Sequence, residues 1–248
     1  MRKSQKSQVF ILIIFLLIPG ISVYTQTSPE QETVRKNNEY RLNKDFFCSF
    51  LRDSGQVLSS PKHWGKKDFI KCGLILGTSY LLFKNDEKIN QWVQSERNDF
   101  TDGVSQVVRN LGDGYFLSGL IGGIYLGGEI FGKREWKKTA LLSLESFLIS
   151  GAIVSGIKII TGRSRPYTGE QATQFHPFSF KSRYYSFPSG HSASAFAVAT
   201  VIAKQSESQL IDFLSYGLAS LVVLSRVNDN YHWASDVLIG SAIGYFVG

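Results

Sequence analysis

The stretch Ser225–Asp236, SRVNDNYHWASD, places an arginine, a histidine and an aspartate between two apolar runs. His232 and Asp236 are four residues apart, so on a helix they would share one face. The Asp236 carboxylate could then accept a hydrogen bond from one ring nitrogen of His232, which would leave the other nitrogen free as a nucleophile or base. Taken alone, such a pair is more often an ordinary surface pair than a reactive site.

A second polar group, Pro188-Ser189-Gly190-His191, opens a run of small residues. Ser189 is a suitable N-cap, so this pattern predicts a helix that begins at Gly190. The free backbone N–H groups at such a helix start favour an anion such as phosphate. His191 stands beside them and could donate a proton.

A third group, KIITGRSRP, contributes Lys158 and Arg165, seven residues apart. A basic residue at the end of an apolar segment is usually a snorkelling side chain, and Arg163 between the two is less expected to have a direct role. Together with Arg226, however, the two cations could hold the nonbridging oxygens of a phosphoryl group. One histidine would attack and the other would protonate the leaving group, so the three groups together predict phosphoryl-transfer chemistry.

These motifs resemble the signature of the type 2 phosphatidic acid phosphatase and vanadium haloperoxidase superfamily, in its membrane-associated phosphatase branch. That signature reads K-x-x-x-x-x-x-R-P, then P-S-G-H, then S-R-x-x-x-x-x-H-x-x-x-D, and residues 158–236 contain all three motifs at the required spacings. The resemblance implies that His232 is the nucleophile, forming a phosphohistidine, and that Asp236 orients it. It implies His191 as general acid and then base. The implied phosphate-binding residues are Lys158, Arg165, Ser189, Gly190 and Arg226.

The resemblance also implies hydrolysis without a metal, and we expect no cofactor. The sequence agrees, since no cluster of carboxylates suited to Mg²⁺ or to a two-metal site lies near the motifs. The chain has only two cysteines, Cys48 and Cys72, which excludes a disulfide framework and a cysteine-rich zinc site.

Apolar segments surround the motifs and must position them. They are rich in Gly, Ala and Ser, which let helices approach closely, and several approach the length that spans a bilayer. No strand alternation or internal repeat is visible. The sequence therefore predicts an all-α, membrane-associated bundle of about six core helices, with 66–248 as the catalytic domain. The segments lie at roughly 68–83, 113–132, 138–160, 190–203, 210–224 and 234–248.

The N-terminal region differs in character. Residues 1–23 combine a basic start with the apolar run VFILIIFLLIPGI, as in a signal peptide or an N-terminal anchor, and 24–65 read as a polar linker or surface helix. The basic loop FGKREWKKT favours the cytoplasmic side, which would put the motif loops outside. An exported N-terminus conflicts with this alternation, so either one segment does not span or the whole bundle is exported. In both cases we expect a bacterial cell membrane protein whose active site faces the periplasmic or extracytoplasmic side.

The charge and composition of the chain limit the classes of partner that we expect. The 248 residues carry a net charge of +7 and are 43% hydrophobic, without a Lys/Arg tract or finger-like Cys/His spacing, so we expect no nucleic acid partner. The expected partners are the membrane and a lipid phosphate or pyrophosphate substrate. The predicted function is a metal-independent lipid phosphatase that uses a phosphohistidine. The alternatives are a soluble broad-specificity acid phosphatase, a vanadate-dependent haloperoxidase, and a non-catalytic membrane scaffold.

Overall fold

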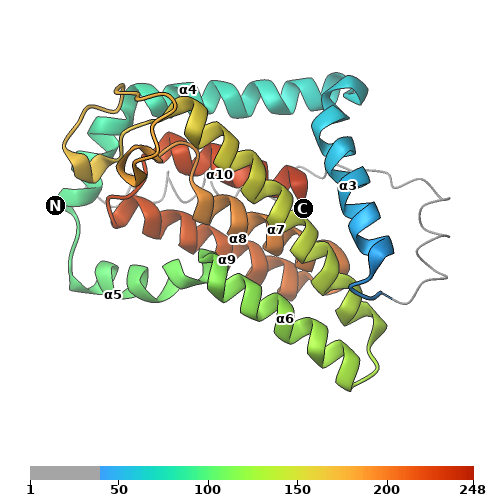
Figure 1. Ribbon diagram of the computed structural model, residues 1–248. Coiled ribbons are helices and arrows are strands. Elements are labelled where there is room, and N and C mark those ends of the chain that lie inside the picture. The colour runs from blue at the N-terminus through green and yellow to red at the C-terminus, as the bar shows by residue number, and fades with distance from the viewer. Residues whose placement is uncertain (1–39) are drawn as a thin grey trace.

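The structure, a computed structural model, describes residues 40–248, and within this range every regular element is helical. The all-α prediction is confirmed, since the described residues form no β-strand and contain only an isolated bridge between Arg163 and Phe175. The predicted signal peptide or anchor at 1–23 lies outside the described residues. Figure 1 shows the α-helices α3 (Lys44–Ser59), α4 (Lys66–Ser95), α5 (Asp99–Val108), α6 (Gly114–Ile130), α7 (Arg134–Thr161), α8 (Gly190–Gln205), α9 (Gln209–Asn228) and α10 (Ala234–Val247).

Each of the six predicted apolar segments forms one helix, namely α4 and α6 to α10. Helix α3 falls within the segment expected to be a linker or surface helix, and Figure 1 shows it apart from the central helices. Helix α5 was not predicted. It begins at a capping box in which the Asn98 side chain accepts from the N–H groups of Phe100 and Thr101, and the Thr101 hydroxyl accepts from Asn98 N–H.

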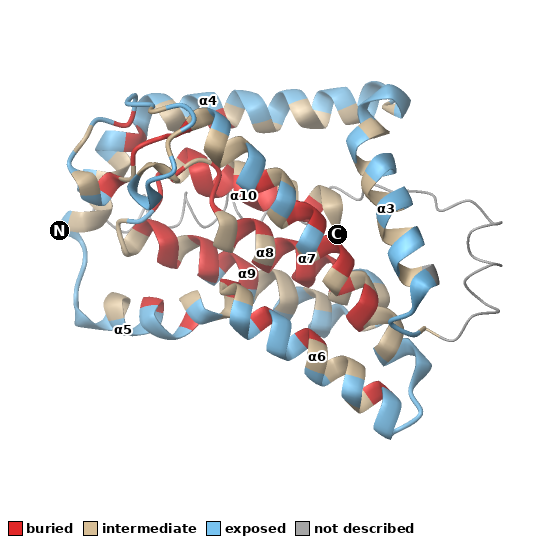
Figure 2. Ribbon diagram, in the orientation of Figure 1, coloured by how far each residue is buried: buried red, intermediate tan, exposed pale blue. Residues whose placement is uncertain are grey.

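Helix α8 is the centre of the bundle, and most of its residues are buried (Figure 2). On one side Phe196 packs in an apolar cluster with Val222 of α9 and Val237 of α10. On the other side Val198 packs with Leu117 of α6 and with α7. Burial of apolar area in these two clusters fixes the helices, and therefore the helix ends, relative to one another.

Helix α10 lies against α8 at a distance that only glycine allows. A Cβ atom on Gly240 would stand 2.4 Å from the carbonyl oxygen of Ser189, and one on Gly244 would stand 2.2 Å from that of Ala193. At the start of the two helices, Ser189 N–H donates to the carbonyl oxygen of Asp236 at 3.0 Å. This close approach joins the second and third sequence motifs.

Two helices of the described chain, α7 and α9, are long and apolar enough to cross a membrane by length and composition. Helix α9 also exposes large apolar side chains, including Leu210, Phe213 and Leu214. Helix α10, with 14 residues, is shorter than the roughly 20 residues that span a bilayer.

We expect Gly244→Ala to lower the free energy of unfolding by about 1–3 kcal/mol, because the added methyl group would overlap backbone atoms of α8 and force α10 outward. Thermal unfolding in detergent measures this. The matched control is Gly156→Ala on α7, where nothing lies within 4 Å and the helix should gain up to about 1 kcal/mol. Equal effects of the two substitutions would contradict the close-packing interpretation.

Candidate active site

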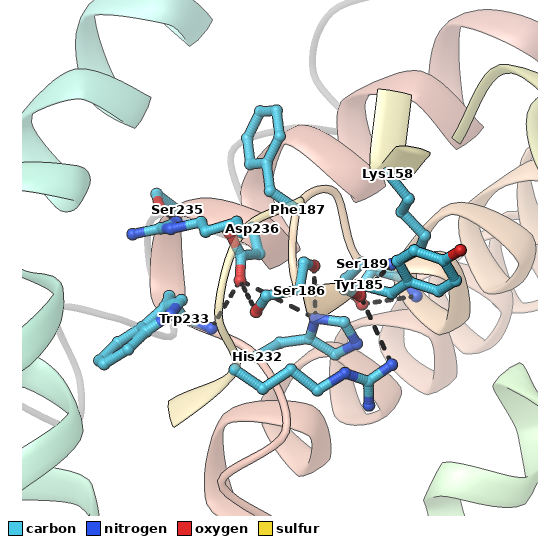
Figure 3. Close-up of polar contacts among 12 residues, drawn as sticks. Lys158, Tyr185, Ser186, Phe187, Ser189, His232, Trp233, Ser235 and Asp236 are labelled. Carbon is cyan, nitrogen blue, oxygen red and sulfur yellow. Dashed lines mark hydrogen bonds and ion pairs between the residues drawn. The ribbon is translucent and has the colours of Figure 1, made fainter. Parts of the chain in front are cut away.

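The three motifs meet at one end of the bundle, on the last turn of α7, the first turn of α8 and the turn between α9 and α10. The long loop 162–189 connects the first two. Lys158 Nζ donates to the carbonyl oxygen of Tyr185 in this loop at 2.6 Å (Figure 3). The structure therefore brings the predicted residues from α7, α8 and α10 into one region, as their expected placement at helix ends required.

His232 lies in the turn before α10 and is only 2% exposed. Its Nδ1 donates to the carbonyl oxygen of Ser186 at 2.8 Å, and Figure 3 shows the ring beside this residue. Because a carbonyl oxygen can only accept, the ring proton is on Nδ1 and Nε2 carries a free lone pair. The nearest carboxylate oxygen of Asp236 is 3.9 Å from Nδ1, so Asp236 acts on His232 through its charge, and not through the direct hydrogen bond expected from the sequence.

The Asp236 carboxylate makes its direct hydrogen bonds to groups other than His232, in part because it caps α10. One carboxylate oxygen accepts from Trp233 N–H at 2.9 Å and from the Ser186 hydroxyl at 2.5 Å. The other accepts from Arg163 Nη1 at 2.5 Å. Burial alone would raise the pKa of Asp236, but Arg163 and His232 more than offset this and lower it to about 2. The carboxylate is therefore charged throughout the physiological pH range.

Arg163 has a larger role than its sequence position indicated. It is 1% exposed and forms a second ion pair, from Nη2 to Asp86 on α4 at 2.8 Å, while its Nε donates to the carbonyl oxygen of Ala172. Asp86 also accepts from the backbone N–H of Ser235 at 3.0 Å and from its hydroxyl at 2.5 Å. Sequence reasoning missed Asp86 and Ser186, since neither belongs to a motif.

Arg165 and Arg226 present unused donors. The buried Nε of each has no hydrogen-bond partner among the described residues. Both guanidinium groups lie near the ring of Tyr231, at 5.3 Å and 4.7 Å from its centroid, and Arg226 also pairs with Asp229 at 3.1 Å. Buried donors without partners are costly, and an anion with several oxygens would satisfy them.

Ser189 caps α8, which confirms the prediction made from its sequence position. Its hydroxyl oxygen accepts from the N–H of Ser192, and the Ser192 hydroxyl lies 2.9 Å away. The next residues, Gly190 and His191, begin the helix, and the first N–H groups of a helix have no intrahelical acceptor. Those groups and the three basic side chains form the donor set that the sequence assigned to a phosphate.

Both histidines are neutral at neutral pH. Burial, followed by the positive charge of Arg226, lowers the pKa of His191 to about 4, and Arg165 and Lys158 act in the same direction. Burial also lowers the pKa of His232 well below its usual value. Each ring would gain a proton more readily next to a bound anion, because the negative charge offsets the surrounding cations.

Within residues 40–248, no group of three or more His, Cys, Asp or Glu side chains is arranged to hold a metal ion. The buried carboxylates of Asp86 and Asp236 are instead paired with Arg163.

We expect inorganic phosphate and vanadate to raise the thermal midpoint of the protein, because both anions would satisfy the guanidinium donors of the folded state. At 100 times Kd the stabilisation should be about 2.7 kcal/mol. Arg226→Gln should abolish most of the increase. Arg97→Gln is the control, since it removes an exposed arginine paired with Asp102 on the surface. An unchanged phosphate response in Arg226→Gln would contradict the anion-site interpretation.

Part of the chain matches one protein-family model, and its fold is similar to two solved structures. The protein-family model "PAP2 superfamily" matches residues 139–248. Lipid A 1-phosphatase of Porphyromonas gingivalis is 36% identical over 117 residues, which is 46% of this chain and 23% of that protein. The chain spans less than half the length of the curated relatives that it matches.

Two crystal structures resemble the fold. LpxE of Aquifex aeolicus superposes with a TM-score of 0.52 and 24% identity, covering 65% of this chain and 91% of that one. The transmembrane PAP2-type phosphatidylglycerolphosphate phosphatase of Bacillus subtilis gives a TM-score of 0.53 and 24% identity, covering 82% and 90%. The matched region includes all three motifs and every predicted site residue. Residues 139–248, which hold these motifs, match the model of the PAP2 superfamily.

Proposed function

We propose that the protein is a membrane-associated, metal-independent phosphatase that hydrolyses a lipid phosphate or pyrophosphate through a phosphohistidine on His232. The observation that carries the proposal is the hydrogen bond from His232 Nδ1 to Ser186, which leaves Nε2 as a free nucleophile. The unpartnered donors of Arg165 and Arg226 support a phosphoryl group as its target.

In the first step Nε2 of His232 attacks phosphorus, and the bond from phosphorus to the leaving oxygen breaks. Lys158, Arg165 and Arg226 stabilise the equatorial oxygens, together with the N–H groups at the start of α8. His191 gives its proton to the leaving oxygen, so the departing group is a neutral alcohol or a less charged phosphate. The negative charge of Asp236 stabilises the positive charge that develops on the His232 ring.

In the second step a water molecule attacks the phosphohistidine. His191, now neutral, takes a proton from this water while the P–N bond breaks and inorganic phosphate forms. His232 returns to its neutral form with the proton still on Nδ1. The cycle consumes one water and needs no metal or redox partner.

A lipid substrate is supported by the apolar surface of the bundle. Helices α7 and α9 could cross a membrane, and Ile130 and Phe131 at the C-terminal end of α6 are also exposed. The relatives from bacteria and plants are named as phosphatases of lipid A or of lipid phosphates. We propose that residues 66–248 form the catalytic domain and that the site faces the extracytoplasmic side of a bacterial membrane.

The direct test is phosphate release by the purified protein in EDTA. The substrates are phosphatidic acid, phosphatidylglycerol phosphate, a polyprenyl pyrophosphate, lipid A and a soluble aryl phosphate. We expect turnover of at least one lipid, competitive inhibition by vanadate, and loss of turnover in His232→Ala. Strong inhibition by EDTA would refute the metal-free mechanism. Turnover of the aryl phosphate alone, with release of the protein from membranes by salt, would indicate a soluble acid phosphatase.

The role of His191 predicts a dependence on both pH and leaving group. Because its pKa is lowered, His191 holds its proton only at acidic pH, so kcat/KM for a lipid phosphate should fall by up to about tenfold per pH unit on the alkaline side. His191→Ala should lower kcat for a lipid phosphate by about 10²-fold or more. An aryl phosphate, whose leaving group needs little protonation, should lose much less. Equal losses for both substrates would contradict the general-acid assignment.

A further inference from the structure

Asp86 lies outside the region that matches the family, on helix α4, yet its side chain is fully buried beside the motif that carries His232. One of its carboxylate oxygens accepts from Arg163 Nη2 at 2.8 Å and from the Ser235 hydroxyl at 2.5 Å. The other accepts from the backbone N–H of Ser235 at 3.0 Å. Asp86 therefore touches both the arginine that holds Asp236 and the residue that precedes Asp236.

Charge balance explains why a second carboxylate matters. Arg163 donates from Nη1 to Asp236 and from Nη2 to Asp86, so one positive charge is shared by two negative charges. If Asp236 were paired with Arg163 and Asp86 were absent, the pair would be neutral. It would then exert only a weak electric field on His232. With Asp86 present, the three groups carry a net charge of −1, which is the sign that stabilises a cationic ring.

The geometry of His232 makes it depend on this net charge. Its Nδ1 is bonded to the Ser186 carbonyl and not to a carboxylate, so Asp236 at 3.9 Å acts through space. The other charged groups that act on the ring are Lys158 on α7 and Arg165 in the loop, and both oppose a positive charge there. The negative charge of the arginine cluster opposes the effect of these cations when the phosphohistidine forms.

We propose that Asp86 is a positioning residue of the active site: by sharing Arg163 with Asp236, it keeps the cluster negative and so stabilises the cationic form of His232. This inference rests on the proposed function for its kinetic consequence, but the electrostatic effect on His232 exists without turnover. It assigns to α4 a part in the chemistry that the family motifs do not contain.

The test compares wild type with Asp86→Asn, a substitution that keeps the size of the side chain and removes its charge. In kinetics, kcat should fall about tenfold or more while KM changes little, because the lost interaction forms in the transition state. The acid limb of the kcat/KM profile should move to lower pH, since removing a negative charge makes His232 harder to protonate. A shift in the opposite direction, or none, would overturn the proposal.

Two further variants separate charge from structure. Ser235→Ala removes the hydrogen bonds of this hydroxyl with Asp86 and Arg163 but leaves both charges, so the acid limb should stay in place. Asp212→Asn on α9 removes a carboxylate far from the site, one of whose oxygens is buried without a partner, and should leave the profile unchanged. In the contrary outcome, kcat of Asp86→Asn and of Ser235→Ala falls only in proportion to the folded fraction of each variant, and the acid limb of neither profile moves. Asp86 is then only structural.

An NMR measurement that needs no turnover distinguishes failure of the inference about Asp86 from failure of the proposed function. The chain has four histidines, so the His232 ring can be assigned by NMR with His232→Ala as reference. In saturating inorganic phosphate, the titration midpoint of His232 should be about one pH unit lower in Asp86→Asn than in wild type. An unchanged midpoint overturns the proposal even if the enzyme is active. A lowered midpoint in a protein that hydrolyses nothing would support it while refuting the phosphatase assignment.

Discussion

The buried arginine Arg163, held between Asp86 and Asp236, is the interaction on which the active-site end of this protein depends. A charge removed from water is stable only when it is paired and fully hydrogen-bonded, and here two carboxylates and a backbone carbonyl use the donors of one guanidinium. The rings of Phe83 and Trp233 pack near it, at 4.8 Å and 5.6 Å from their centroids. The cluster ties α4, the loop 162–189 and the start of α10 into one unit, and loss of Arg163 would leave two buried carboxylates without a counter-charge.

The helix bundle serves this cluster by bringing helix ends together. Helix α8 is buried along most of its length, and the glycines of α10 let the two helices approach until Ser189 bonds directly to the Asp236 backbone. The two core clusters of the bundle are apolar, and the proposed chemistry lies at the end of the bundle, where free backbone N–H groups and loop carbonyls are available as partners. This division explains how a protein with an apolar surface can hold several charges in one small region.

The electrostatic character of the site follows from its three basic side chains and its two uncharged histidine rings. Three basic side chains surround two rings that burial keeps neutral, and two guanidinium N–H groups have no protein acceptor in the described part of the chain. Such a site is complete only with an anion, which supplies the missing acceptors and raises the proton affinity of the rings. In the proposed mechanism, substrate binding and protonation of His191 are then the same event.

The sequence by itself determined the helices and the motif residues. Apolar segments and the cap at Ser189 predicted α4 and α6 to α10, because helix formation and burial depend on local composition. The spacing of the motifs identified His191, His232 and Asp236 as candidate site residues. Only the tertiary structure decided the partners: Ser186 orients His232, Asp236 caps α10, and Asp86 joins from α4. The contact of Ser186 with His232 and that of Asp86 with Ser235 join residues 46 and 149 positions apart, and no local pattern records which distant side chain will balance a buried charge.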